Sequence, residues 1–176
     1  MPPEAPPPRL RFGQVWITRP SVVGPEPHVL PRHIVPCLVS LVDIELADLA
    51  PGHPAVAAVP VSLAVAFQSD RDLLVPAEAG PLGCAYMIEV WNEVTMLTCQ
   101  LGRYVGELRQ PFKRYLGRLY QAQLGTHVDL SRLASYLGPP LTGEHDPRFA
   151  FQIHEYEVCE YLRRPLLRLL RRLELR

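Results

Sequence analysis

Alternating polar and apolar residues in the first part of the chain predict short β-strands. Residues 13–18 alternate and include β-branched and aromatic side chains, as half-buried strands do. Residues 34–42 and 55–62 are almost continuously apolar, which is typical of strands covered on both faces. A proline inside residues 34–42 favours an edge or bulged position for that strand. Residues 73–75 and 86–91 complete a predicted set of five strands.

Turns separate these strands at close spacing. Five short strands connected in this way predict a small closed or semi-closed barrel, because closure removes exposed sheet edges. The connection over residues 19–33 contains four prolines and a glycine, so we expect it to be long and irregular, with no core of its own.

Helix signals replace strand signals after residue 108. Proline or aspartate stands at the expected helix starts, and glycine stands at the expected ends. These signals predict three helices, over residues 111–124, over residues 130–137, and from Asp146-Pro147 toward the C-terminus.

The chain is therefore predicted to be a mainly β protein with C-terminal helices. We divide it into a disordered, proline-rich lead (residues 1–11), a β-barrel domain (residues 12–108) and a helical extension (residues 109–176). A chain of 176 residues can build one sizeable core, and two full independent domains are not expected.

Composition narrows the functional classes. The formal net charge is zero, so no field of the whole molecule attracts nucleic acid or an acidic membrane. No apolar stretch reaches the roughly 20 residues of a membrane span, and the first eight residues do not fit the hydrophobic region of a signal peptide. We expect a cytoplasmic protein that does not associate with membranes.

Cysteine and histidine spacing gives no sign of a metal site. The four cysteines form no C-x-x-C pair, and the six histidines form no i, i+4 pair. We expect reduced cysteines that behave as small apolar side chains, no bound metal and no cofactor.

Four short motifs occur in the order typical of one protein family. They are Gly-Gln-Val-Trp at 13–16, Val-Pro-Cys-Leu-Val-Ser at 35–40, Ala-Val-Pro-Val-Ser at 58–62 and the Leu-Gly-Arg-Tyr-Val-Gly-Glu-Leu segment that ends at 108. In this the chain resembles the MazF/PemK-type toxin endoribonucleases, over about Gly13 to Leu124. The resemblance implies a five-stranded SH3-like barrel and the toxin role of a toxin–antitoxin system.

The chain departs from this family at the position expected to carry charge. The resemblance implies that an arginine stabilises the phosphate during RNA cleavage and that a threonine binds at the scissile site. Here Val35 stands at the arginine position, and valine cannot stabilise negative charge. Arg32 or His33 would have to replace it, with Ser62 at the threonine position. These three are the candidate catalytic residues of a metal-independent endoribonuclease.

Two polar clusters within the predicted barrel are further candidates. Residues 69–72 (Ser-Asp-Arg-Asp) are interpreted as a solvated turn. Strand alternation places Glu89, Trp91 and Glu93 on one face, where two acids could act as an acid/base pair or could form an exposed strand face. We favour the exposed face and take Trp91, Asn92 and Glu93 as a candidate partner surface.

The C-terminal segment is strongly amphipathic. Residues 163–176 hold six arginines and one glutamate, and leucines recur at helical spacing. Pro165 lies inside the predicted helix, so we expect a bend or restart near it. The leucine stripe could dock on the barrel or on a second copy, could enter a groove of a partner protein, or could leave the arginines to contact nucleic-acid backbone. A membrane-surface helix is a further, less favoured alternative. The candidate contact residues are Arg163, Arg164, Leu166, Arg168, Leu169, Arg171 and Arg172.

We therefore predict a non-catalytic interaction protein that binds a protein partner, or itself as a homodimer, through its barrel and C-terminal helix. The alternatives are a sequence-specific endoribonuclease and a protein that binds RNA through its arginine-rich tail.

Overall fold

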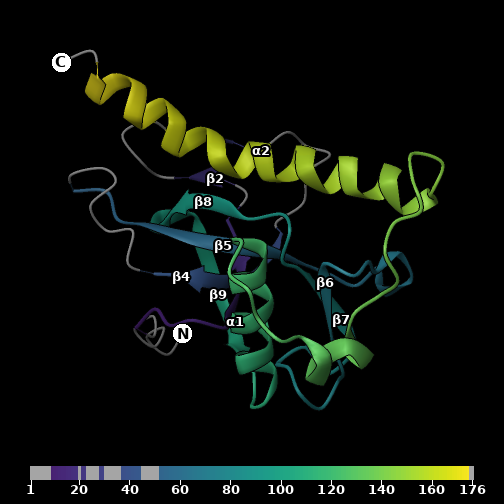
Figure 1. Cartoon of the computed structure of the whole chain (residues 1–176). Coiled ribbons are helices and arrows are strands. Elements are labelled where there is room, and N and C mark those ends of the chain that lie inside the picture. The colour runs from purple at the N-terminus through teal and green to yellow at the C-terminus, as the bar shows by residue number, and fades with distance from the viewer. Residues whose placement is uncertain (1–8, 20, 23–27, 30–36, 45–51, 175–176) are drawn as a thin grey trace.

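The computed structural model describes residues 9–19, 21–22, 28–29, 37–44 and 52–174, and it is a β+α fold in which an antiparallel sheet is followed by C-terminal helices (Figure 1). Seven strands form one sheet. They are β1 (Gln14–Thr18), β4 (Leu38–Asp43), β5 (Ala55–Ser62), β6 (Asp72–Val75), β7 (Tyr86–Glu89), β8 (Val94–Leu97) and β9 (Leu101–Glu107).

The sheet is antiparallel and follows the order β6-β7-β5-β4-β1-β9, with β8 also paired to β5. Within the described part of the chain, β6 and β9 form the two ends of this order and do not pair with each other. The strands predicted at residues 13–18, 55–62 and 73–75 are confirmed as β1, β5 and β6, and the strand predicted at residues 86–91 is confirmed only over residues 86–89, as β7.

Three sequence predictions about the sheet are wrong. It has seven strands rather than five, because β8 and β9 had not been predicted as strands. The edge position allowed for β4 is wrong, because β4 lies between β1 and β5, whereas the bulged alternative agrees with the register shift between Leu41 and Asp43 in its pairing with β5. The connection between β1 and β4 is not wholly irregular, because β2 (Ser21–Val22) and β3 (His28–Val29) pair in a small sheet.

Strand β5 has two separate strands, β8 and β7, along one of its sides. Along one side it pairs first with β8, from Ala55 to Ala58, and then with β7, at Val61 and Ser62. Pro60 falls in the gap between the two ladders, and proline has no N–H to donate to a neighbouring strand. The segment that connects β7 to β8 leaves the sheet at this gap and forms the turn over residues 90–93. This turn carries several of the candidate functional residues.

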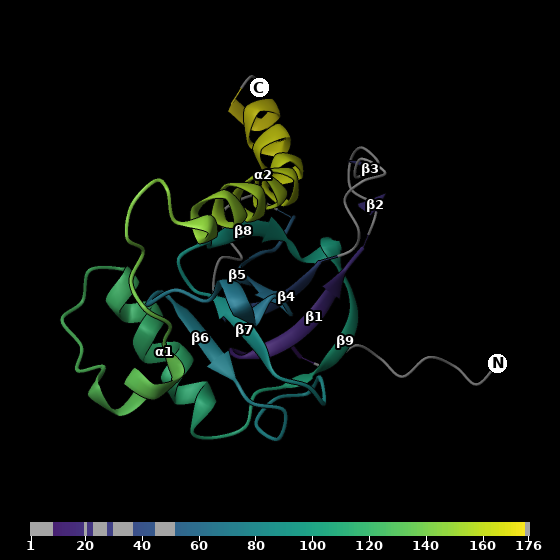
Figure 2. The same ribbon diagram turned by 90° about the vertical axis from the view of Figure 1, so that its right-hand side faces the viewer.

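Alternate residues of β5 pack on opposite faces of the sheet. Ala57, Val59 and Val61 belong to a core shared with helix α1 (Phe112–Gln123) and the 3₁₀ helix η3 (Ser131–Tyr136). Val56 and Ala58 belong to a second core shared with helix α2 (Pro147–Glu174). Both sides of β5 are covered, which explains its unbroken apolar sequence. Figure 2 shows α1 and α2 on different sides of the sheet.

The three predicted helical segments are confirmed as α1, η3 and α2. Asp146 caps α2 as predicted, since the Arg148 backbone N–H donates to its Oδ1 at 3.0 Å. The helix does not restart at Pro165 but runs unbroken through it. The Gln100 side chain donates a hydrogen bond to the Leu162 carbonyl at 2.8 Å, and this bond ties the helix to the sheet just before the proline.

Candidate functional site

A buried acidic pair lies where β6 begins and β7 ends, next to the turn between β7 and β8. Glu89 ends β7 and lies directly opposite Asp72, the first residue of β6, in the antiparallel register. Glu89 has no exposed surface and Asp72 only 2%. The expectation of a solvated turn at residues 69–72 is therefore wrong for Asp72 and for Ser69, which is also fully buried.

Asp72 is held by three donors. The backbone N–H and the hydroxyl of Ser69 donate to its Oδ2 at 2.7 and 2.6 Å, and the Trp91 indole N–H donates to its Oδ1 at 2.9 Å. Burial raises the pKa of Asp72 above its usual value, and these hydrogen bonds oppose that shift because they favour the charged form. The carboxylate is accordingly solvated by protein groups in place of water.

Glu89 is poorly solvated in comparison. The Asn92 amide donates to its Oε2 at 3.3 Å, and its Oε1 has no hydrogen-bond partner among the described residues. Burial, followed by the charges of Glu155 and Asp72, raises the pKa of Glu89 to about 9. Glu89 is therefore protonated at neutral pH, whereas the three donors to Asp72 favour the charged form of that carboxyl group.

Helix α2 closes the acidic pair off from solvent. Gln152 donates to the Ser69 hydroxyl at 3.4 Å, and the Cys159 thiol lies 3.7 Å from the Asn92 carbonyl oxygen. Two carboxyl groups in different protonation states could serve as an acid/base pair, but a substrate must reach them. Glu89 and Asp72 are both buried, so a substrate has no direct access to them in this structure.

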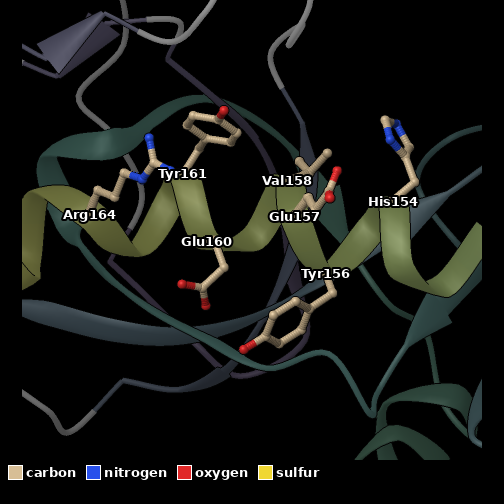
Figure 3. A pocket seen from close by; sticks show the side chains of 7 residues that line it. All are labelled: His154, Tyr156, Glu157, Val158, Glu160, Tyr161 and Arg164. Atoms are coloured by element: carbon tan, nitrogen blue, oxygen red, sulfur yellow. The ribbon is translucent and has the colours of Figure 1, made fainter.

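The other side of α2 has the opposite character. Phe149, Ile153 and Tyr156 recur at helical spacing and are 38%, 50% and 50% exposed. A surface hollow of about 470 Å³ runs along the same part of the helix. Figure 3 shows Tyr156 and Glu160 on one side of the ribbon and His154 and Tyr161 on the other, all from this one helix. The hollow is lined by both polar and apolar side chains of this helix.

No protein-family model and no curated protein matches this chain.

The described residues contain no group of three or more histidine, cysteine, aspartate or glutamate side chains that could hold a metal ion. Among these same residues, every helix is too short or too polar to cross a membrane.

Of the three candidate catalytic residues, Ser62 is the one that lies in the described part of the chain. Ser62 is half-buried at the end of β5, and its hydroxyl accepts the Ala64 N–H at 3.2 Å. Arg32, His33 and the motif position Val35 lie outside the described residues.

The candidate partner surface at residues 91–93 is engaged within the chain. The Trp91 indole binds Asp72, and Asn92 is only 3% exposed. Glu93 accepts the Tyr120 hydroxyl at 2.7 Å through its side chain and the Arg163 guanidinium at 3.0 Å through its carbonyl. Strand alternation had placed Glu89, Trp91 and Glu93 on one exposed face; this is wrong, because β7 ends at Glu89 and that side chain is buried.

The C-terminal candidates divide between two sides of α2. Leu166 and Leu169 are buried with Leu97 of β8, so the leucine stripe docks on the sheet of its own chain. Arg163 is half-buried and pairs with Glu160 at 2.5 Å. The remaining arginines of the set are exposed: Arg164, Arg168, Arg171 and Arg172.

Sequence reasoning missed two groups of residues. Glu155 and Cys159 are single residues without a motif, and only the docked helix brings them to the turn. The exposed apolar set Phe149, Ile153 and Tyr156 could have been found, because the i, i+4, i+7 spacing follows directly after the helix start that was recognised.

Proposed function

We propose that this protein is a non-catalytic interaction module that binds a protein partner through the outer face of α2. One observation carries the proposal: α2 has apolar residues on two sides, and the described chain covers only one of them. The outer face comprises Phe149, Ile153, Tyr156, Glu157, Glu160, Arg164, Leu167 and Arg171.

Packing within the chain does not account for this outer face. A helix docked on a sheet needs one apolar stripe, and Leu162, Leu166 and Leu169 already provide it. Clustered exposed apolar residues rimmed by charged ones are typical of interaction surfaces. Glu157 and Glu160 also make this face unsuited to a nucleic-acid backbone, which repels carboxylates.

We further propose that the sheet is a diverged SH3-like barrel of the MazF/PemK type. The described residues of the four family motifs lie on β1, β4, β5 and β9 or immediately beside these strands. These strands are neighbours in the sheet, since β1 pairs with both β4 and β9, and β4 pairs with β5. The non-catalytic assignment rests on Val35, which replaces the charged residue of the family motif. The buried acidic pair offers no substitute, since no substrate can reach it.

Site-specific photo-cross-linking tests the proposal. A photoreactive phenylalanine replaces Tyr156 in the full chain, expressed in the organism that encodes it, and the control replaces Leu124, which is 63% exposed beyond the end of α1. We expect a discrete cross-linked protein from position 156 and none from position 124. Equal, diffuse cross-linking from both positions, or none at 156, contradicts the proposal. Purified protein that cleaves long single-stranded RNA in chelator would instead support the ribonuclease alternative.

A further inference from the structure

Charge is segregated along α2. The first part of the helix carries Glu155, Glu157 and Glu160, while five arginines and one glutamate follow from residue 163 onward. Arg148 is the one arginine of the first part, and it is paired with Asp146 at 2.5 Å. The helix is therefore acidic in its middle and basic toward its end.

The outer face shares this segregation. Glu157 and Glu160 lie on its N-terminal half, and Arg164 and Arg171 lie on its C-terminal half. Arg164 is held against the helix by its own neighbour, since its guanidinium lies 4.0 Å from the centre of the Tyr161 ring. Glu160 is half-buried, and its Oε1 accepts a hydrogen bond from the Arg163 guanidinium. A carboxylate can accept at both oxygens, so Oε2 can still accept a second donor.

We propose that the occupant of this face is the outer face of a second copy of the same chain, with the two α2 helices antiparallel. This inference rests on the proposed function and names its partner. An antiparallel pair centred near residue 162 sets Glu160 opposite Arg164 of the second copy and Tyr156 beside Leu167 of that copy. The two-fold axis makes each contact twice.

Two further features favour a second copy in this orientation. A parallel pair would place glutamate beside glutamate and arginine beside arginine, which is unfavourable. The antiparallel pair places each acidic part beside a basic part, and an isologous interface requires this kind of self-complementarity. The chain has zero net charge, so no overall repulsion separates the copies. At about 1.5 Å per residue the helix is roughly 40 Å long, which gives the pair an extended seam.

Charge exchange tests this arrangement. Glu160→Arg sets arginine opposite arginine in a dimer of that variant, and Arg164→Glu sets glutamate opposite glutamate. Mixing the two variants restores opposite charges at both symmetry-related positions. Arg114→Glu, on the exposed side of α1, is the matched control. The full-length proteins are compared by sedimentation equilibrium at low salt.

We expect wild type and the Arg114→Glu control to sediment at twice the 19.8 kDa chain mass. Each single variant should self-associate roughly tenfold more weakly or worse, and their equimolar mixture should recover the wild-type dimer. Recovery on mixing excludes misfolding as the cause of weakening. The second copy is overturned as occupant if wild type is monomeric or if the single variants self-associate as tightly as wild type. It is also overturned if the equimolar mixture of the two variants does not recover the dimer. A cross-link from position 156 to a different protein would then leave the proposed function standing, and no cross-link would remove both.

Discussion

Glu89 has no exposed surface, and its behaviour depends on the proton that it carries. Its pKa is raised to about 9, first because burial penalises the charged form and then because Glu155 and Asp72 are nearby. In the unfolded chain a glutamate has a pKa near 4.5. The folded state therefore holds this proton through a pH range in which the unfolded state has released it.

The sign of the resulting pH dependence follows from linkage. Between about pH 4.5 and 9 the folded state binds more protons at Glu89 than the unfolded state does, so this residue's contribution to stability falls as pH rises through that window. Glu89→Gln mimics the protonated side chain and removes this dependence. We expect the variant to gain stability relative to wild type as pH rises, by up to about 1.4 kcal/mol per pH unit.

Urea unfolding at pH 5, 7 and 8.5 measures this difference directly. The matched control is Glu78→Gln, because Glu78 is exposed and its substitution should leave the wild-type pH profile unchanged. A Glu89→Gln variant whose stability relative to wild type is the same at all three pH values would show that Glu89 is not protonated in the folded state.

Single residues also mark the limit of the sequence predictions. Alternation assigned Glu89 to the face opposite Tyr86 and Ile88 without revealing that α2 covers it. Ser69 and Asp72 looked solvated because their neighbours in the sequence are polar, whereas Trp91 and Gln152, distant along the chain, bury and bind them. Such contacts are tertiary and leave no local pattern.

At the level of elements, the strength of the local signal decided what could be predicted. β5 was predicted over its full length because seven of its eight residues are apolar and they occupy both faces. β8 was not predicted, because four residues after an irregular turn carry too little periodicity, and only its pairing with β5 makes it a strand. The barrel prediction counted five strands because neither β8 nor β9 was recognised as a strand.

Helix α2 has a docked side and an outer side, and the two should respond differently to truncation. Leu162 is 1% exposed in the core beneath the helix, and Leu167 is 38% exposed on the outer face. We expect Leu162→Ala to destabilise the fold by about 2–5 kcal/mol through the cavity it leaves. Leu167→Ala should change stability by less than about 0.5 kcal/mol under dilute, monomeric conditions.

Chemical denaturation of the two variants at micromolar concentration gives the comparison, with coincident fluorescence and circular dichroism transitions as the check for two-state behaviour. Similar losses for both variants would mean that the outer face is packed within the chain. In that case the distinction between the two sides of α2, and the proposal built on it, would fail.

At the scale of the whole molecule, the sheet and the helices form shared cores. Leu116 and Leu119 of α1 belong to the same core as Val59, and Leu162 of α2 joins Trp16 and Val56 on the other side. The sequence distinguished the mainly β part from the helical part because the apolar period changes after residue 108. It could not show that the helices cover opposite faces of one sheet (Figures 1 and 2).

Because of this arrangement, one side of α2 is buried against the sheet and the other side is exposed. The candidate residues at 91–93 and those of the leucine stripe are engaged in contacts within the chain, whereas the outer face of α2 remains exposed and carries charges of both signs. The amphipathic helix was evident from the sequence, but which side faces the sheet was not, because α2 carries apolar residues on both sides.

Hydroxyl-radical footprinting by mass spectrometry shows directly whether a partner covers the outer face of α2, with the chain labelled inside the cells that encode it and again as dilute purified protein. We expect Phe149, Ile153 and Tyr156 to be oxidised in dilute protein and protected in cells, while the exposed Leu63 and Leu124 are oxidised equally in both. Equal oxidation of the outer face in both conditions would contradict this expectation.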